Sequence, residues 1–294
     1  MKVVIFTRTG FHHTSFINRL QERFEVVCVV RETYPGLPKK STLFSAFRDL
    51  FRKDSSVPMR DERFLEKFSE IYSAGFRYHP MLQHYLKAHF DVVAEKPGIT
   101  YLTIGCGEIN SPELREYLKP FKPDIIAVLG SSVIKPAMIS LPSAAMINIH
   151  SGLSPYYRGT WSYGWPIVNS EPESIGVTLH HISTGIDSGD IICQTKPRLE
   201  RNDGLNSIFL KVIAEGIELM IRAIEKFSDN GNVPSYTQPK HVGRLYQTKD
   251  FNADAARSCL KNLEKGIIDE YLLNREARDS QVKLFGYIPP VLFQ

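Results

Sequence analysis

Three polar residues stand out because their side chains together could hold a carbonyl group and move a proton. Asn148 and His150 lie two positions apart in "MINIHSGLSPYYRG" (146–159), where an apolar run breaks into a polar loop. Asp187 lies further along, in the loop "STGIDSGD". An amide can stabilise a developing oxyanion, an imidazole can move a proton, and a carboxylate can orient the imidazole and raise its basicity. The set predicts acyl transfer to an amine, in which the substrate supplies the nucleophile.

Each of these residues also has an ordinary structural interpretation. A lone histidine at a strand end is more often structural than catalytic, and Asp187 has the character of a turn residue. Asp190 competes with Asp187 because it lies three residues further along the same loop. His180 and His181 suggest a metal site with His150, but adjacent residues on a strand point to opposite faces, so at most one could join. We therefore expect no metal site.

The elements that must position these residues follow the pattern of a doubly wound α/β sheet. Apolar runs predict strands at 2–7, 25–32, 98–104, 123–130, 144–150, 174–182 and 189–195. Amphipathic runs predict helices at 14–24, 111–121, 132–139, 159–170 and 205–227. Residues two apart on a strand face the same side, so Asn148 and His150 should face one side together. In open α/β sheets, ligands bind at the carboxyl ends of the strands, which is where both residues lie.

The chain divides into a predicted catalytic domain over residues 1–228 and a C-terminal appendage over 229–294. A helical insertion at about 34–96 interrupts the alternation and is too long for an ordinary connection. The appendage begins with a polar, turn-rich stretch, and two short helices are expected at 253–264 and 265–276. The predicted fold class is α/β, with a Rossmann-like, mostly parallel sheet, the helical insertion and the small appendage.

Composition narrows the function classes. Hydrophobic residues make up 43% and charged residues 23%, and the net charge of +4 is too weak to argue for nucleic acid. The four cysteines form no CxxC pair, which argues against a zinc site and a disulfide framework. The N-terminal "MKVVIFTRTG" enters a strand directly, and no run approaches the roughly 20 apolar residues of a membrane helix. We expect a soluble, cytoplasmic protein.

The turn after the first strand, "TRTGFHHTS", lacks the G-x-G-x-x-G pattern of dinucleotide-binding folds, and a P-loop lysine motif is also absent. NAD and ATP are therefore poor candidates despite the α/β pattern.

The candidate residues resemble the signature of the folate-dependent formyltransferases. "INIHSGLSPYYRG" followed by "TGIDSGDII" is similar to that family's N-x-H-x-S-x-L-P-x-x-x-G and later D-x-G. The chain departs from the pattern at Gly152, where serine is usual, and at Ser154-Pro155, where the L-P pair is expected. These departures affect the shape of the loop. The matching positions are Asn148, His150, Gly159, Asp187 and Gly189.

The resemblance implies a folate-dependent N-formyltransferase in which Asn148, His150 and Asp187 are the catalytic residues. The formyl donor would be 10-formyltetrahydrofolate. Its pterin would be held by backbone groups of two loops, one after the fourth strand and one before the aspartate. The corresponding residues are Ser132, Val133, Ile134, Ile182, Ser183 and Thr184.

The acceptor amine stays open at this point. Methionyl-tRNA formyltransferases carry a C-terminal barrel and a basic surface, glycinamide ribonucleotide formyltransferases lack the insertion and the tail, and formyltetrahydrofolate hydrolases carry an N-terminal regulatory domain. By elimination we predict that the acceptor is a small molecule, the amine of a nucleotide-linked amino sugar. We expect no membrane or nucleic-acid partner. The alternatives kept are a formyltetrahydrofolate hydrolase, a methionyl-tRNA formyltransferase, a glycinamide ribonucleotide formyltransferase and, with less support, a non-catalytic folate-binding protein. A homodimer is kept open as an assembly. Lys240, Arg244 and Lys249 form either a diphosphate clamp or a solvated basic loop.

Overall fold

The computed structural model describes residues 1–33, 63–64, 67–68 and 92–290. The helical insertion predicted over about 34–96 therefore falls largely outside the described residues, as do residues 291–294.

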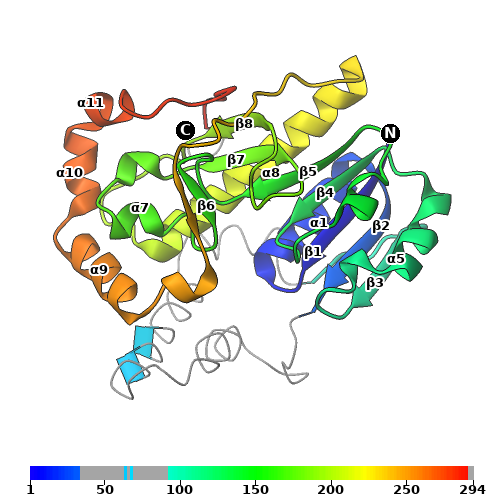
Figure 1. Ribbon diagram of the computed structural model, residues 1–294, viewed down its shortest axis with the longest axis horizontal. Helices are drawn as coiled ribbons and strands as arrows, with labels where there is room; N and C mark the ends of the chain where they lie inside the picture. The colour runs from blue at the N-terminus through cyan, green and yellow to red at the C-terminus, as the bar shows by residue number, and fades with distance from the viewer. Residues whose placement is uncertain (34–62, 65–66, 69–91, 291–294) are drawn as a thin grey trace.

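A seven-stranded sheet forms the centre of the molecule, in the strand order β3-β2-β1-β4-β5-β7-β8 (Figure 1). Strands β3, β2, β1, β4 and β5 run parallel, β7 is antiparallel to β5, and β8 is antiparallel to β7. The Rossmann-like, doubly wound, mostly parallel sheet predicted from the sequence is confirmed. The strands are β1 (Lys2–Arg8), β2 (Glu25–Glu32), β3 (Thr100–Ile104), β4 (Ile125–Leu129), β5 (Ala145–His150), β7 (Val177–His181) and β8 (Ile191–Thr195).

The sheet is covered on both faces because its central strands are apolar on both faces. On β1, Val3 and Ile5 belong to one buried cluster, whereas Val4 and Phe6 belong to another. The first cluster includes α1 (Phe11–Arg23) and α8 (Leu205–Asn230), and the second includes α5 (Pro112–Leu118) and α6 (Pro136–Ile139). Alternate side chains of the same strands thus anchor the two helical layers.

Four short 3₁₀ helices also lie in the described part of the chain. These are η1 (Glu108–Asn110), η2 (Lys119–Phe121), η3 (Pro172–Ser174) and η4 (Thr248–Asp250). The start of α5 matches the sequence prediction, because Ser111 caps it by accepting a hydrogen bond from the backbone N–H of Leu114 and Pro112 occupies its first position.

The helix predicted at 159–170 is largely wrong. Residues Trp165–Val168 form the short helix α7, whereas Tyr157–Gly159 form strand β6. Strand β6 pairs in parallel with β9 (Arg244–Tyr246), which comes from the segment after α8. A local hydrophobic pattern cannot reveal this pairing, because the two strands are more than 80 residues apart.

The segment after α8 packs onto the rest of the molecule through helices and through β9 (Figure 1). Its helices are α9 (Ala253–Glu264), α10 (Ile267–Leu273) and α11 (Arg275–Asp279). Helix α9 lies against α7, while α10 and α11 lie against η3. In the described part of the chain, no helix has the length and apolar character that crossing a membrane requires.

Candidate active site

A cavity of about 600 Å³ opens at the carboxyl ends of the parallel strands. Arg8 at the end of β1, Leu129 at the end of β4 and His150 at the end of β5 all line it. It lies next to β1 and β4, the adjacent strands from which the strand order runs outward in opposite directions. Such a switch point is the usual ligand position in open α/β sheets.

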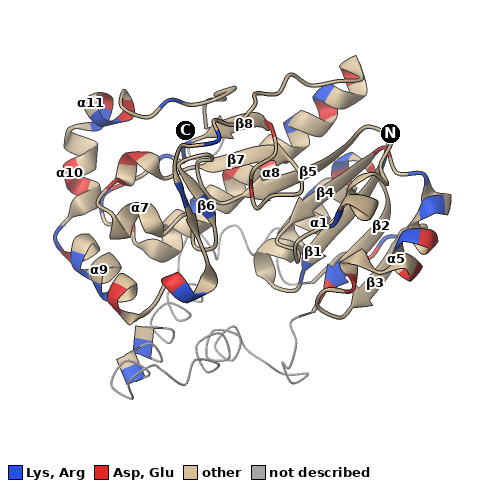
Figure 2. Cartoon of the chain, in the orientation of Figure 1, with Lys and Arg blue, Asp and Glu red and all other residues tan. Residues whose placement is uncertain are grey.

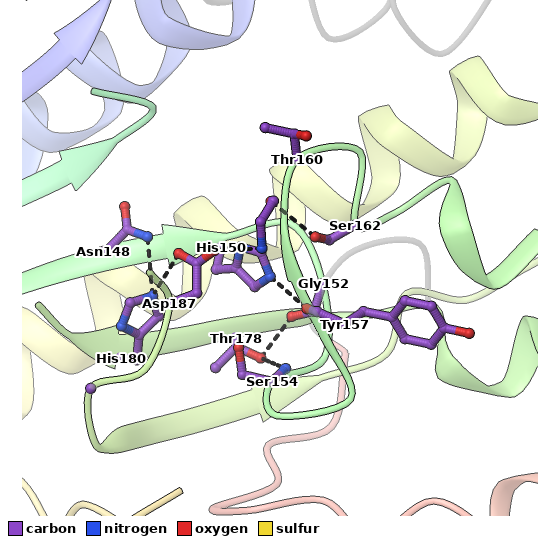
Figure 3. Close-up of polar contacts among 12 residues, drawn as sticks. Asn148, His150, Gly152, Ser154, Tyr157, Thr160, Ser162, Thr178, His180 and Asp187 are labelled. Atoms are coloured by element: carbon purple, nitrogen blue, oxygen red, sulfur yellow. Dashed lines mark hydrogen bonds and ion pairs between the residues drawn. The ribbon is translucent and has the colours of Figure 1, made fainter. Parts of the chain in front are cut away.

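The structure brings Asn148, His150 and Asp187 together in this cavity (Figure 3). The Nδ1 atom of His150 lies 3.3 Å from Oδ2 of Asp187, and the same oxygen accepts a hydrogen bond of 2.8 Å from the Gly159 amide. Asn148 and His150 come from one strand, whereas Asp187 comes from the loop between β7 and β8. Asp190 was the alternative to Asp187 as the catalytic carboxylate. It does not line the cavity, and its charge instead favours the protonated form of His181.

A further histidine, His180, completes the polar network. In the antiparallel pairing of β5 with β7, Asn148 stands directly opposite His180, and Asn148 Nδ2 lies 3.1 Å from His180 Nε2. His180 Nδ1 lies 2.8 Å from the His181 carbonyl oxygen, which can only accept, so Nδ1 carries a hydrogen. Nε2 of a neutral His180 therefore accepts from the Asn148 amide. The contact determines the orientation of the Asn148 amide, with Nδ2 directed toward His180.

The His150 ring is held by a backbone carbonyl group. Its Nε2 atom lies 2.8 Å from the carbonyl oxygen of Tyr157, so Nε2 carries the hydrogen and donates it there. The lone pair of a neutral His150 is then on Nδ1, on the side of Asp187. The position that can take up a proton is thus Nδ1, next to a carboxylate that would stabilise the resulting imidazolium.

The electrostatics of the site keep this pair in the base and carboxylate forms. Burial lowers the pKa of His150, and the Asp187 carboxylate and the Tyr157 carbonyl only partly oppose this change. Burial by itself would raise the pKa of Asp187, but His150, His180 and the Gly159 amide outweigh it and hold that pKa well below its usual range. Near neutral pH, His150 is neutral and Asp187 is ionised.

Five of the six residues expected to bind the folate line the same cavity: Ser132, Val133, Ile134, Ile182 and Ser183. Thr184 does not line it. The side chains of Val133 and Ile186 are 64% and 45% exposed, so the cavity has an apolar rim that a flat aromatic ring could cover.

Some of the expected backbone contacts are used within the protein. The Ser132 amide donates to Glu32, and the Val133 carbonyl accepts from Asn110. The Ile182 amide donates to the carbonyl of Met146. The two N–H groups are therefore not available to a ligand, whereas the Val133 carbonyl has a second lone pair that can still accept.

Several lining residues were not predicted from the sequence. They come from the end of β1, the start of α1, the turn after β6, helix α8, and the end of β9 with the residues that follow it: Arg8, His12, Thr160, Phe209, Tyr246, Gln247 and Thr248. The pairing of β6 with β9 brings the last three residues to the cavity, and no local signal announces it. Lys240 and Lys249 are not among the described lining residues, and neither is Arg244, whose guanidinium lies 3.7 Å from Glu171.

Within the described residues, no group of three His, Cys, Asp or Glu side chains is arranged to hold a metal ion. In the cluster of His150, His180 and Asp187, the carboxylate instead lies between the two imidazole rings: Oδ2 is 3.3 Å from His150 Nδ1, and Oδ1 is 3.6 Å from His180 Nε2.

Comparison with known proteins bears on this geometry directly. Residues 92–224, which include β3 to β8 and the three candidate residues, match the family model described as formyl transferase. Residues 92–224 belong to the formyl transferase family. The resemblance inferred from the sequence motif is confirmed by this match.

The relatives of this formyl transferase segment differ in their acceptors. A methionyl-tRNA formyltransferase of Agathobacter rectalis is 29% identical over 155 residues, which is 52% of this chain and 46% of that protein. An N-formyltransferase structure from Helicobacter canadensis is 17% identical with a TM-score of 0.52, covering 89% of this chain and 80% of that one. A phosphoribosylglycinamide formyltransferase from Bacillus halodurans is also 17% identical with a TM-score of 0.50, covering 79% and 97%.

The chain spans about half the length of the curated relatives it matches. The structural likenesses, at this level of identity, show the fold alone. The choice among acceptors must therefore come from the residues of the cavity.

Proposed function

We propose that this protein transfers a formyl group from 10-formyltetrahydrofolate to a primary amine, and that the amine belongs to a nucleotide-linked amino sugar. The observation that carries the proposal is the convergence of Asn148, His150 and Asp187 on one cavity. The reaction replaces the bond between the formyl carbon and N10 of the donor with a bond from that carbon to the acceptor nitrogen, and one proton passes from the acceptor nitrogen to N10.

Asn148 is suited to stabilise the negative charge that develops on the formyl oxygen. One hydrogen of its Nδ2 is directed to His180, which leaves the other for a ligand oxygen in the cavity. Because the amide is already oriented, little reorganisation is needed as the charge develops. A single donor of this kind typically contributes about a hundredfold to a thousandfold in rate.

His150 is suited to accept the proton of the attacking amine at Nδ1. Its Nε2–H continues to donate to the Tyr157 carbonyl oxygen, so the ring does not need to turn during the transfer. Asp187, at 3.3 Å from Nδ1, stabilises the positive ring and so favours the uptake. Return of the proton from Nδ1 to the leaving nitrogen restores the neutral histidine.

The folate donor fits the observations at the other side of the cavity. The apolar side chains of Val133 and Ile186 are exposed at the rim, as expected if a ring system covers them. Ile134 and Ser183 line the same space, and we expect their backbone groups to bind a heterocycle edge that carries both donors and acceptors.

The segment after α8 supports a nucleotide sugar over tRNA as the acceptor. The helices of residues 253–279 carry no clustered basic surface: Figure 2 shows both basic and acidic residues on α9 and α11, and only acidic residues on α10. A tRNA would call for a clustered basic surface. Tyr246, Gln247 and Thr248 instead line the cavity, where Gln247 and Thr248 offer hydrogen-bonding groups to a compact polar ligand. The structure from Helicobacter canadensis is a complex with folinic acid and dTDP-3-aminofucose.

The test is to incubate the protein with 10-formyltetrahydrofolate and to follow tetrahydrofolate release with each of three acceptors: nucleotide-linked amino sugars, glycinamide ribonucleotide and methionyl-tRNA. We expect release that depends on an amino sugar and that His150→Ala abolishes. Release with water alone would indicate a hydrolase, and release only with methionyl-tRNA would overturn the acceptor assignment. Binding of the donor without turnover for any acceptor would contradict the catalytic proposal.

A further inference from the structure

The backbone of the loop that carries Asp187 is held by a side chain from the segment after α8. The amide nitrogen Nε2 of Gln238 donates to the carbonyl oxygen of Asp187 at 3.0 Å and to that of Gly189 at 2.6 Å. Gln238 is 7% exposed, so these hydrogen bonds are shielded from water. One side chain thus holds the loop on both sides of Ser188.

Gln238 is itself anchored to the strand that follows this loop. Two residues earlier, Tyr236 exchanges backbone hydrogen bonds of 2.7 and 2.8 Å with Ile191 of β8. The side chain of Gln238 therefore starts from a fixed position relative to the sheet, and its two hydrogen bonds transmit that position to Asp187.

The Asp187 backbone needs such support. Its φ angle is 45°, in the left-handed region that a residue with a side chain adopts at a cost. Nearby, a Cβ atom on Gly189 would collide with the carbonyl oxygen of His181, which shows how closely the loop is pressed against β7. A strained conformation of this kind persists where its surroundings determine it.

The orientation of the Gln238 amide indicates that its contribution is the two hydrogen bonds that Nε2 donates. Both partners are carbonyl oxygens, so only the nitrogen can face them. The Oε1 atom is buried and has no hydrogen-bond partner in the part of the chain that the structure describes. A buried acceptor without a partner is unfavourable, so the two donated bonds must outweigh it.

We infer that Gln238 is a positioning residue for catalysis, which holds the Asp187 carboxylate at His150 by fixing the backbone of the Asp187 loop. The inference rests on the proposed function, because it assigns Gln238 a role in that reaction. It also extends the active site into the segment after α8, which contributes a second support: β9 pairs with β6, and β6 carries the Gly159 amide that binds the Asp187 carboxylate.

The experiment compares Gln238→Met and Gln238→Glu with the wild type. Methionine has a similar length and no donor, whereas glutamate would place an acceptor against two carbonyl oxygens. Gln281→Met is the matched control, because Gln281 is exposed on the same segment and lies away from the cavity. We expect kcat to fall by about tenfold to a hundredfold in both Gln238 variants, with the KM values for donor and acceptor within about twofold of the wild type.

A second measurement does not depend on turnover. The titration of the His150 ring is followed by NMR in protein labelled at the histidine nitrogens, with His150→Gln used for assignment. The groups that act on this ring are Asp187, the Tyr157 carbonyl, His180 and Arg158. Of these, the Asp187 carboxylate raises the pKa of His150, so its displacement in Gln238→Met should lower that pKa toward the value in Asp187→Asn.

The outcomes separate the two proposals. A lowered His150 pKa and a reduced kcat in Gln238→Met, with Gln281→Met unchanged, support the positioning role. An unchanged His150 pKa overturns it, even if the variant is less active because it is less stable. If the wild type transfers no formyl group to any amine, the proposed function fails, while the NMR titration still decides whether Gln238 holds Asp187.

Discussion

Asn148 and His180 stand directly opposite each other on the antiparallel strands β5 and β7, with the Asn148 amide nitrogen 3.1 Å from Nε2 of His180. Because Nδ1 of His180 donates to a backbone carbonyl, the imidazole presents an acceptor to the amide. The orientation of the proposed oxyanion donor is thus set by a residue on a neighbouring strand.

We predict that His180→Phe lowers kcat about tenfold with little change in the KM values, because the ring remains while the acceptor for Asn148 is lost. Steady-state kinetics measure the effect. In an Asn148→Ala background the same substitution should have a much smaller effect, since it would act through an amide that is no longer there. Full additivity of the two substitutions would show that His180 does not act through Asn148.

We predict that Asp187→Asn lowers kcat about a hundredfold or more, whereas Asp190→Asn leaves kcat within about twofold of the wild type. An asparagine at 187 could still accept the hydrogen bond from Gly159, so the shape of the loop is kept while the charge beside His150 is lost. The kinetics of both variants under identical conditions provide the check. Comparable losses in the two variants would mean that the loop, rather than the carboxylate at 187, matters.

We predict that Gly159→Ala destabilises the protein by about 3 kcal/mol, because an added Cβ would collide with the Tyr246 carbonyl and because the φ angle of 91° is in the left-handed region. Gly98→Ala is the matched control: its φ angle is 84° and nothing lies within 4 Å of its added Cβ. Urea unfolding should show a loss of about 1 kcal/mol for the control. Equal losses would indicate that the contact between β6 and β9 is looser than described.

We predict that the free energy of unfolding falls as the pH drops from 7 to 5. Burial lowers the pKa of His12 from its ordinary 6.5 to about 4, so in this pH range the unfolded chain binds a proton that the folded protein does not. Stability therefore rises with pH between the two values, and His12 alone should account for about 2 kcal/mol of the change. Denaturant unfolding of His12→Phe, compared with the wild type at both pH values, measures its share. If the variant keeps the full pH dependence, the source lies in other groups.

Much of the sheet could be predicted from the sequence because its strands carry their own signal. Runs such as "KVVIFT" are apolar on both faces, and only a strand covered on both sides buries all of them. The spacing of Asn148 and His150 likewise fixed their common direction, since side chains alternate along a strand.

What could not be predicted depends on contacts between distant parts of the chain. Strand β6 forms because Arg244–Tyr246 lies beside Tyr157–Gly159, and neither stretch is a convincing strand alone. The Tyr157 carbonyl oxygen that accepts from Nε2 of His150 is a backbone group, so no residue type in the sequence indicates this contact. His180 was identified as a candidate residue, but its position opposite Asn148 follows from the register of β5 and β7, which the sequence pattern leaves undetermined.

The parallel pairing of β6 with β9 also matters to anyone who shortens or recombines this protein. Truncated versions that stop after α8 would retain the whole central sheet and every residue of the family motif, yet they would lack the neighbour that shapes the Gly159 turn. Chimeras that exchange the tail between homologues to alter acceptor preference would change the geometry of the acid–base pair as well. A loss of turnover in such hybrids should therefore not be interpreted as a change in specificity alone.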